Sequence, residues 1–211
     1  FTALQFERFQ SLVRELEAGG VQFKLRHCCN SAATLLCPEY ALDMVRPGIA
    51  TYGISPSEEL EGRFDLRPLM SLRTTVSQIR PFRPGVGISY GRSYPPEGAR
   101  RSAVLAIGYA DGLSRSLSNR ASFLLRGKRV PVVGRICMDM CMVDVTEVPE
   151  AAVGDVVTVF GADGSGASIP VDDLARLTGT IPYETLCSIN KRTPRFYLDG
   201  DQRTEVLQYI V

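Results

Sequence analysis

The sequence has little net charge, no long apolar stretch and no secretory signal, and each shortage narrows the possible functions. Its 211 residues carry 24 Lys and Arg against 23 Asp and Glu, a formal net charge of +1. A chain this balanced gives no electrostatic reason to expect nucleic acid or a membrane surface as partner. No apolar run approaches the ~20 residues that a spanning helix needs. We therefore expect a soluble globular protein that contacts neither nucleic acid nor, in this segment, a membrane.

The six cysteines lack the regular spacing of a secreted disulfide framework. They occupy positions 28, 29, 37, 137, 141 and 187. This irregular spacing favours reduced thiols and predicts a cytoplasmic protein. A zinc site built from Cys137, Cys141 and His27 is an alternative. However, cysteine and methionine alternate over 137–143, which two faces of one strand already explain. We therefore expect no metal.

The chain begins without Met, inside an amphipathic helix. Apolar residues at positions 6, 9, 12, 13 and 16 recur at spacings of three and four, as on one face of a helix. Such an opening indicates a fragment of a longer protein, and whether the truncation is natural or engineered stays open.

Two apolar segments near the N-terminus predict buried strands, 23–28 and 44–52, joined by a short helix that Ser31 would cap. A helix–strand–helix–strand order is typical of β/α crossovers with a parallel sheet. Two strands cannot stand alone, so their sheet needs further strands from elsewhere. The strands end beside Asn30-Ser31 and Pro47-Gly48, and such ends hold phosphate in parallel α/β proteins. We therefore predict half of a phosphate-cofactor site.

The same two strands carry the chain's only histidine, His27, and an arginine, Arg46. An arginine in an otherwise apolar strand is costly unless it is paired, or unless it reaches solvent at the strand end. A lone histidine is more often a satisfied core residue than a functional one. Their equivalent depth on neighbouring strands nevertheless favours a His27–Arg46 contact.

The composition changes near residue 55. Residues 56–65 are polar and acidic and read as a linker. Short apolar runs follow at intervals of roughly ten residues, typical of an all-β domain. We expect strands over 70–79, 102–107, 122–125, 128–133, 137–145 and 155–160, and helices over 171–177 and 182–189. Strands 196–198 and 204–210 are expected to close the sheet as a hairpin around Asp199-Gly200.

Three motifs in this region combine glycine with aromatic or charged residues. GISYGRSY places Tyr90 on a tight turn, IGYADG places Tyr109 at a strand end, and VGRICMDM contains Met138. Turn formers such as Asp and Gly fix these positions. Taken singly, Tyr90 could simply pack at a turn and Met138 could belong to the core.

Taken together and in order, these motifs resemble one family closely. HCCNSAATL, MVRPGIATYG, GISYGRSY, IGYADG, VGRICMDM and the closing RTPRFY resemble the C-terminal part of a PLP-dependent alanine racemase. The resemblance covers nearly all 211 residues. It implies an α/β plus mainly β fold: residues 1–55 form the last two strands of a TIM-type α/β barrel, truncated here, and 56–211 form a C-terminal β-rich domain.

The resemblance also implies the activity. These isomerases interconvert L- and D-alanine for cell-wall peptidoglycan, with pyridoxal 5′-phosphate as cofactor and homodimers that share their active sites. The family's PLP-bearing lysine lies on the first barrel strand and has no counterpart here. The full-length protein would therefore be an alanine racemase, whereas the 211 residues alone are expected to be inactive.

Individual roles follow from the same resemblance. Tyr90 matches the catalytic base that a partner subunit supplies opposite the lysine. Arg46 matches the arginine facing the pyridine nitrogen, and His27 matches its hydrogen-bonding histidine. The phosphate holders are Ser31, Gly48 and Ile49. Tyr109 and Met138 match substrate-binding residues from the partner.

One departure concerns the substrate. Many members carry Ser-Tyr before the final R-x-P-R, whereas this chain has Asn190-Lys191. An amide can hydrogen-bond a hydroxymethyl group, so Asn190 is a candidate substrate-binding residue and serine an alternative substrate. Related racemases linked to glycopeptide resistance act on serine and carry a membrane domain, which leaves an upstream anchor open. Two further alternatives are a broad-specificity racemase and a non-catalytic β domain for dimerisation or binding.

Overall fold

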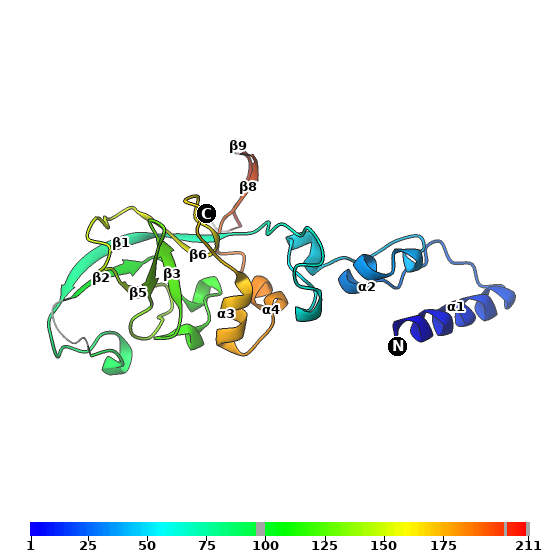
Figure 1. Ribbon diagram of the computed structural model, residues 1–211, viewed down its shortest axis with the longest axis horizontal. Coiled ribbons are helices and arrows are strands. Elements are labelled where there is room, and N and C mark those ends of the chain that lie inside the picture. The colour runs from blue at the N-terminus through cyan, green and yellow to red at the C-terminus, as the bar shows by residue number, and fades with distance from the viewer. Residues whose placement is uncertain (96–99, 201, 210–211) are drawn as a thin grey trace. The chain divides into compact units, whose positions relative to one another are not determined.

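A computed structural model describes residues 1–95, 100–200 and 202–209, and the chain divides into two compact units. The first comprises Phe1–Met70 and the second Ser71–Val211. Segment 56–70 groups with the first unit. In Figure 1 the colours run from blue to cyan over the first unit and on to red over the second. Across the described ranges, no helix is both long and apolar enough to cross a membrane.

The N-terminal unit is built from helices and turns. Its α-helices are α1 (Thr2–Ala18) and α2 (Ser31–Leu36), and short 3₁₀ turns cover Pro38–Tyr40, Ile49–Tyr52 and Glu58–Leu60. Phe6 of α1 stacks on Tyr40, with ring centroids 4.0 Å apart. This contact ties the first helix to the segment that follows α2.

The two buried strands expected over 23–28 and 44–52 are absent, so that prediction is wrong. Among the residues described there, an isolated parallel bridge between Asn30 and Arg46 is the only ladder contact. Phe23 and Leu25 are 41% and 59% exposed. A strand needs neighbours for its backbone polar groups, and the described part of this unit offers no ladder beyond this single bridge.

The cap of α2 also differs from the prediction. Asn30, not Ser31, is the N-cap residue, and its side chain accepts a 3.0 Å hydrogen bond from the Ala33 N–H. Ser31 is buried, and its hydroxyl accepts from the Ala50 N–H at 3.2 Å. A buried hydroxyl needs such a partner. Ser31 is therefore directed at the 49–52 turn rather than at its own helix.

The C-terminal unit is mostly β, with one large antiparallel sheet. Its order is β4-β3-β6-β1-β2-β5, with β7 paired to β6. A bridge between Val132 and Val143 brings the β4 and β5 ends together, so the sheet is a nearly closed barrel. The strands are β1 (Leu72–Phe82), β2 (Arg100–Leu105), β3 (Ser122–Leu125), β4 (Lys128–Pro131), β5 (Cys141–Asp144), β6 (Val156–Ala162) and β7 (Ser168–Ile169).

The core of this unit lies inside the curved sheet and beneath two helices, α3 (Val171–Thr178) and α4 (Pro182–Ser188). Phe123, Leu105 and Phe160 are among the fully buried side chains. Helix α3 buries Leu174, and Gly179 ends the helix with φ +73°, a left-handed conformation that favours glycine. Both helices form where the sequence predicted them.

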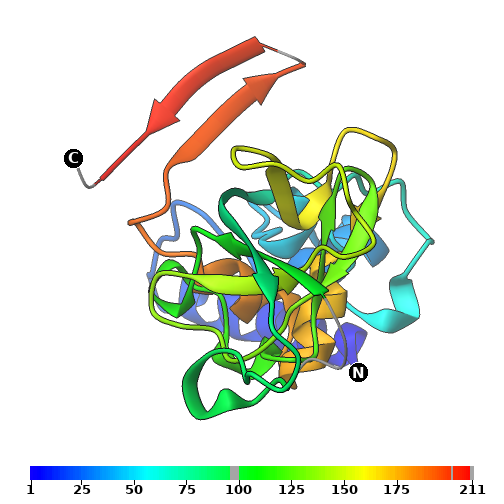
Figure 2. The same cartoon turned by 90° about the vertical axis from the view of Figure 1, so that its left-hand side faces the viewer.

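The last two strands form a separate hairpin, β8 (Arg195–Asp199) and β9 (Gln202–Leu207). Figure 2 shows this hairpin extending away from the main sheet. The hairpin around Asp199-Gly200 forms as predicted, but the expectation that it would close the main sheet is wrong, because β8 and β9 form a two-stranded sheet of their own. The second strand was expected to reach residue 210, which lies outside the described residues.

The strand expected over 137–145 begins only at Cys141. Residues 137–140 form a loop, and Met138 and Met140 are exposed. The carbonyls of Cys137 and Met138 accept hydrogen bonds from Tyr109 and Ala110, at 3.0 and 2.9 Å. Because these carbonyls bond to the Tyr109–Ala110 turn, they are not paired with a neighbouring strand. The predicted alternation of cysteine and methionine on two strand faces therefore fails over 137–140.

Candidate functional site

The candidate residues of the N-terminal unit centre on Arg46. Its Nη1 lies 2.5 Å from His27 Nδ1, so the predicted His27–Arg46 contact is confirmed. Because a guanidinium is always protonated and can only donate, Nδ1 must be the acceptor and the proton of a neutral His27 must be on Nε2. Two backbone carbonyl groups also bind Arg46. Its backbone N–H donates to Cys29 O at 2.9 Å, and its side-chain Nη2 donates to Cys28 O at 3.4 Å.

Donors suited to a phosphate group gather where α2 meets the 49–52 turn. Ser31 Oγ lies beside the Ala50 amide. The Ile49 N–H has no hydrogen-bond partner among the described residues. A Cβ built on Gly48 would meet no atom within 4 Å, so the backbone there is open to close approach. A hydroxyl, a free amide and an open glycine are the features that a phosphate monoester requires.

These residues fit the cofactor that the sequence implies. Pyridoxal phosphate presents a phosphate and a ring nitrogen to its protein. The N-terminal unit offers hydroxyl and amide donors for the first, and for the second a guanidinium oriented by His27. The described residues contain no cluster of three or more His, Cys, Asp or Glu side chains that would hold a metal ion.

In the C-terminal unit, Tyr90 lies on a strained turn. Its side chain is 70% exposed, so the ring does not pack into the core of this unit. Ser89 and Arg92 have φ values of +63° and +49°, which cost non-glycine residues about 1–3 kcal/mol each. Ser89 Oγ donates to Arg135 O at 2.6 Å and fixes the turn against the neighbouring loop. The turn therefore holds the Tyr90 phenol out from the surface.

Tyr109 and Met138 are brought together by their backbones. Beyond the two hydrogen bonds between their turns, the Gly108 N–H donates to Asp111 Oδ2 at 2.8 Å. The turns touch so closely that a Cβ on Gly108 would lie 2.3 Å from Met138 O. Both side chains are exposed at this junction.

An ion network that the sequence did not predict fastens the closing R-x-P-R segment to these turns. Arg192 Nε lies 3.0 Å from Asp111 Oδ1, and its Nη2 lies 2.5 Å from Asp139 Oδ1. The hydrogen bond to Asp139, followed by the charge of Asp111, raises the pKa of Arg192. The Asp-Gly pair at 111–112 had predicted a turn. The ion pair between Asp111 and Arg192 was not predicted.

Asn190 uses both ends of its amide within the chain. Its Nδ2 donates to the Ala110 carbonyl, and its Oδ1 accepts from the Arg192 N–H at 2.9 Å. Asn190 is exposed. The residue therefore links the closing segment to the turn that carries Tyr109.

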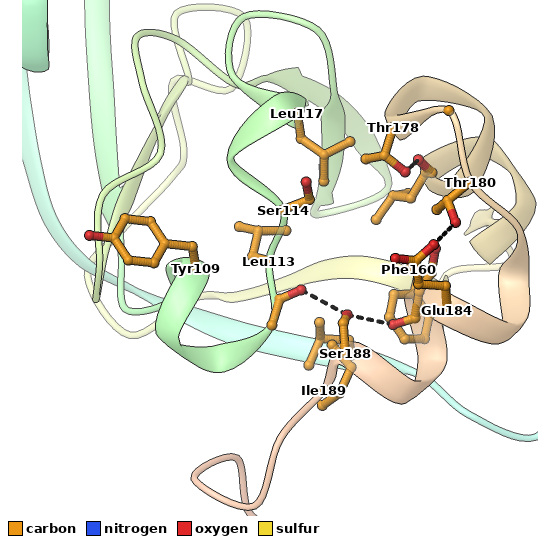
Figure 3. A pocket seen from close by; sticks show the side chains of 15 residues that line it. Tyr109, Leu113, Ser114, Leu117, Phe160, Thr178, Thr180, Glu184, Ser188 and Ile189 are labelled. Atoms are coloured by element: carbon orange, nitrogen blue, oxygen red, sulfur yellow. Dashed lines mark hydrogen bonds between the residues drawn. The ribbon is translucent and has the colours of Figure 1, made fainter.

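A cavity of about 500 Å³ lies within the C-terminal unit, beside the Tyr109 turn. Figure 3 shows Leu113, Leu117 and Phe160 on its wall, with the Tyr109 ring at one edge pointing outward. On its polar side, Thr180 donates to Glu184. The Tyr109 hydroxyl points away from this cavity.

Comparisons with known proteins agree with the motifs. Residues 69–197 match the family model for the alanine racemase C-terminal domain, and residues 1–56 match the model for the N-terminal domain. An alanine racemase of Desulfovibrio desulfuricans is 50% identical over 195 residues, covering 92% of this chain and 52% of that protein. One from Methanococcus maripaludis is 45% identical over 199 residues, covering 94% and 53%. The chain thus spans about half the length of these curated relatives.

Solved structures give the same result. Alanine racemase of Clostridium difficile 630, in complex with cycloserine, has a TM-score of 0.90 at 37% identity, covering 100% of this chain and 55% of that one. The Bacillus anthracis enzyme with bound L-Ala-P has a TM-score of 0.89 at 39% identity, covering 97% and 53%.

Proposed function

The chain belongs to the alanine racemase family, and from this premise we propose that it forms part of a PLP-dependent racemase interconverting L- and D-alanine for peptidoglycan. The observation that carries the proposal is that the cofactor-binding groups and the candidate catalytic base lie in different units. Cofactor donors gather around Arg46 and Ser31 in the first, and the second presents the Tyr90 phenol to solvent. An active site shared between subunits needs such a division.

The N-terminal unit would bind the cofactor. Ser31 Oγ and the Ile49 N–H would donate to the phosphate, with Gly48 leaving room for it. Arg46 would face the ring nitrogen and, as a permanent cation, keep it unprotonated. His27 would hold the guanidinium in place. When bound, PLP supplies the electron sink that acidifies the substrate Cα–H.

Tyr90 would exchange a proton with the substrate Cα on one face, and a lysine outside these 211 residues would serve the other. A phenol has a pKa of about 10 and is a strong base once ionised. In the proposed homodimer, Tyr90, Tyr109 and Met138 would act at the partner's cofactor. The turn that exposes Tyr90 supports this, because its phenol is free to meet another surface.

The proposed substrate is alanine. The solved relatives carry L-Ala-P and cycloserine, both small alanine-like molecules. Both ends of the Asn190 amide have partners within the chain, so Asn190 gives no support for serine as the substrate. We propose that Asn190 acts on the substrate side indirectly, through the Ala110 turn.

The domain assignment is part of the same proposal. Residues 1–55 would complete a TIM-type barrel whose other strands lie outside the chain, and 56–211 would form the β domain, with segment 56–70, which groups with the first unit, as the connection. The exposed Phe23 and Leu25 support this, because missing strands would cover them. We further propose a cytoplasmic enzyme, and the 211 residues by themselves should be inactive.

The test is Tyr90→Phe in the longer protein, with Tyr94→Phe as the matched control. Tyr94 lies on the same loop, where its carbonyl accepts from the Ile88 N–H at 3.0 Å. Loss of a general base should lower racemisation roughly 10²–10⁴-fold while cofactor absorbance persists. Tyr94→Phe should retain activity. Near wild-type turnover of Tyr90→Phe in both directions would exclude Tyr90 as the base.

A further inference from the structure

The adjacent thiols of Cys28 and Cys29 point to the same atom. Cys28 Sγ lies 3.5 Å and Cys29 Sγ 3.1 Å from the Tyr40 carbonyl oxygen. In a regular strand, neighbouring side chains would point to opposite faces. Because this segment is not a strand, both sulfur atoms lie on one side of the backbone. Cys29 is buried, Cys28 is half-buried, and neither forms a disulfide.

The backbone of the same dipeptide holds the candidate cofactor residue. The Cys29 carbonyl accepts from the Arg46 N–H, and the Cys28 carbonyl accepts from Arg46 Nη2. A ligand that bridges the two sulfur atoms would therefore bind the same dipeptide whose carbonyl groups support Arg46.

We propose that Cys28 and Cys29 form a dithiol site for trivalent organoarsenic compounds. An arsine oxide, R–As=O, condenses with the two thiols: two S–H bonds break, two As–S bonds form, and the oxygen leaves as water without any redox change. Two sulfur ligands are sufficient for R–As(III). The described residues offer no three-ligand cluster for a metal ion, so a hard or tetrahedral metal is a poor match.

The proximity of the two sulfur atoms favours chelation over reaction at single thiols. The first As–S bond places the arsenic beside the second sulfur, so the second bond forms within the molecule at high effective concentration.

The test uses phenylarsine oxide and intact-mass spectrometry of the 211-residue chain, with excess glutathione to remove singly bonded arsenic. One adduct is expected, and peptide mapping should place it on the peptide containing Cys28 and Cys29. Its yield should fall at least roughly tenfold in Cys28→Ser and in Cys29→Ser. Cys187→Ser, which changes an exposed thiol, is the matched control and should retain it.

Several outcomes overturn the proposal. These are an adduct that persists in Cys28→Ser, one that is lost in Cys37→Ser, and no adduct on the wild-type chain. If a variant misfolds, peptide mapping of the adduct on the wild-type chain still shows whether the arsenic is bound to Cys28 and Cys29. In the longer protein, phenylarsine oxide should also lower cofactor absorbance, and a dithiol should restore it. This last arm rests on the proposed function, whereas the mass measurement does not.

Discussion

Replacing Gly108 by alanine should separate the turns that carry Tyr109 and Met138. The backbone of Gly108 is extended, with φ −147°, so alanine adopts its conformation without strain. The obstacle is steric: the new Cβ would lie 2.3 Å from Met138 O and 2.4 Å from Cys137 O. Both atoms belong to backbone and cannot rotate away as a side chain would.

The size of the effect follows from these distances. A carbon–oxygen contact needs about 3.3 Å, so the turns must move apart by roughly 1 Å. That shift breaks or weakens the two hydrogen bonds from Tyr109 and Ala110, each worth about 0.5–1.5 kcal/mol. The expected destabilisation is therefore about 1–3 kcal/mol, the usual range for an overpacked site. A displacement of about 1 Å near the chemistry also costs roughly 10²-fold in kcat/KM.

Thermal unfolding of the 211-residue chain measures the first effect, and alanine racemisation by the longer protein measures the second. A fall of a few to about 10 °C in the C-terminal unit is expected. Gly19→Ala is the control, because its φ is −79° and its Cβ would lie 3.3 Å from the nearest atom. An unchanged midpoint in Gly108→Ala would refute the steric argument. A lowered midpoint with unchanged kcat/KM would remove the Tyr109–Met138 pairing from the proposed substrate site.

Two further predictions concern charge and substrate choice. The Asp155 pKa is lowered, first by hydrogen bonds from the Arg126 side chain at 2.7 and 2.8 Å and then by the Ala152 N–H. A lowered pKa gives stability that is present above the ordinary value of 3.8 and is lost as pH falls below it. Unfolding midpoints between pH 5 and 2 should therefore fall more steeply in wild type than in Asp155→Asn, and parallel curves would contradict this. Asn190→Ala should lower racemisation of L-Ala and L-Ser alike, because the amide bonds to Ala110, whereas a selective loss of L-Ser would show direct contact.

Much of the C-terminal unit could be predicted because its signals are local. The strand over 122–125 has the bounds that the sequence indicated, and helix α3 begins at Val171 as expected. Alternating burial, turn glycines and first-turn aspartates act over a few residues, so they can be recognised without knowing the fold. The prediction failed at 137–140, where the partner of the backbone is a turn about 30 positions earlier in the chain.

The strands expected in the N-terminal unit failed for a different reason. Their apolar pattern is genuine, yet a strand is stabilised by its neighbours, and the described residues supply one bridge, Asn30–Arg46. The pattern indicated which residues would be buried in a complete sheet. It could not indicate whether that sheet would be present.

The sequence by itself determined the residue types of the candidate site: the phenol of Tyr90, the side chains of His27 and Arg46, and the small residues suited to phosphate. These depend on residue type and order, which the motifs state directly. Only the tertiary structure decided which groups meet across the chain. Arg192 contacts Asp139, which lies 53 positions away in the sequence, and Asn190 contacts Ala110, which lies 80 positions away. Such contacts depend on how the barrel-like sheet closes, and no local pattern encodes that closure.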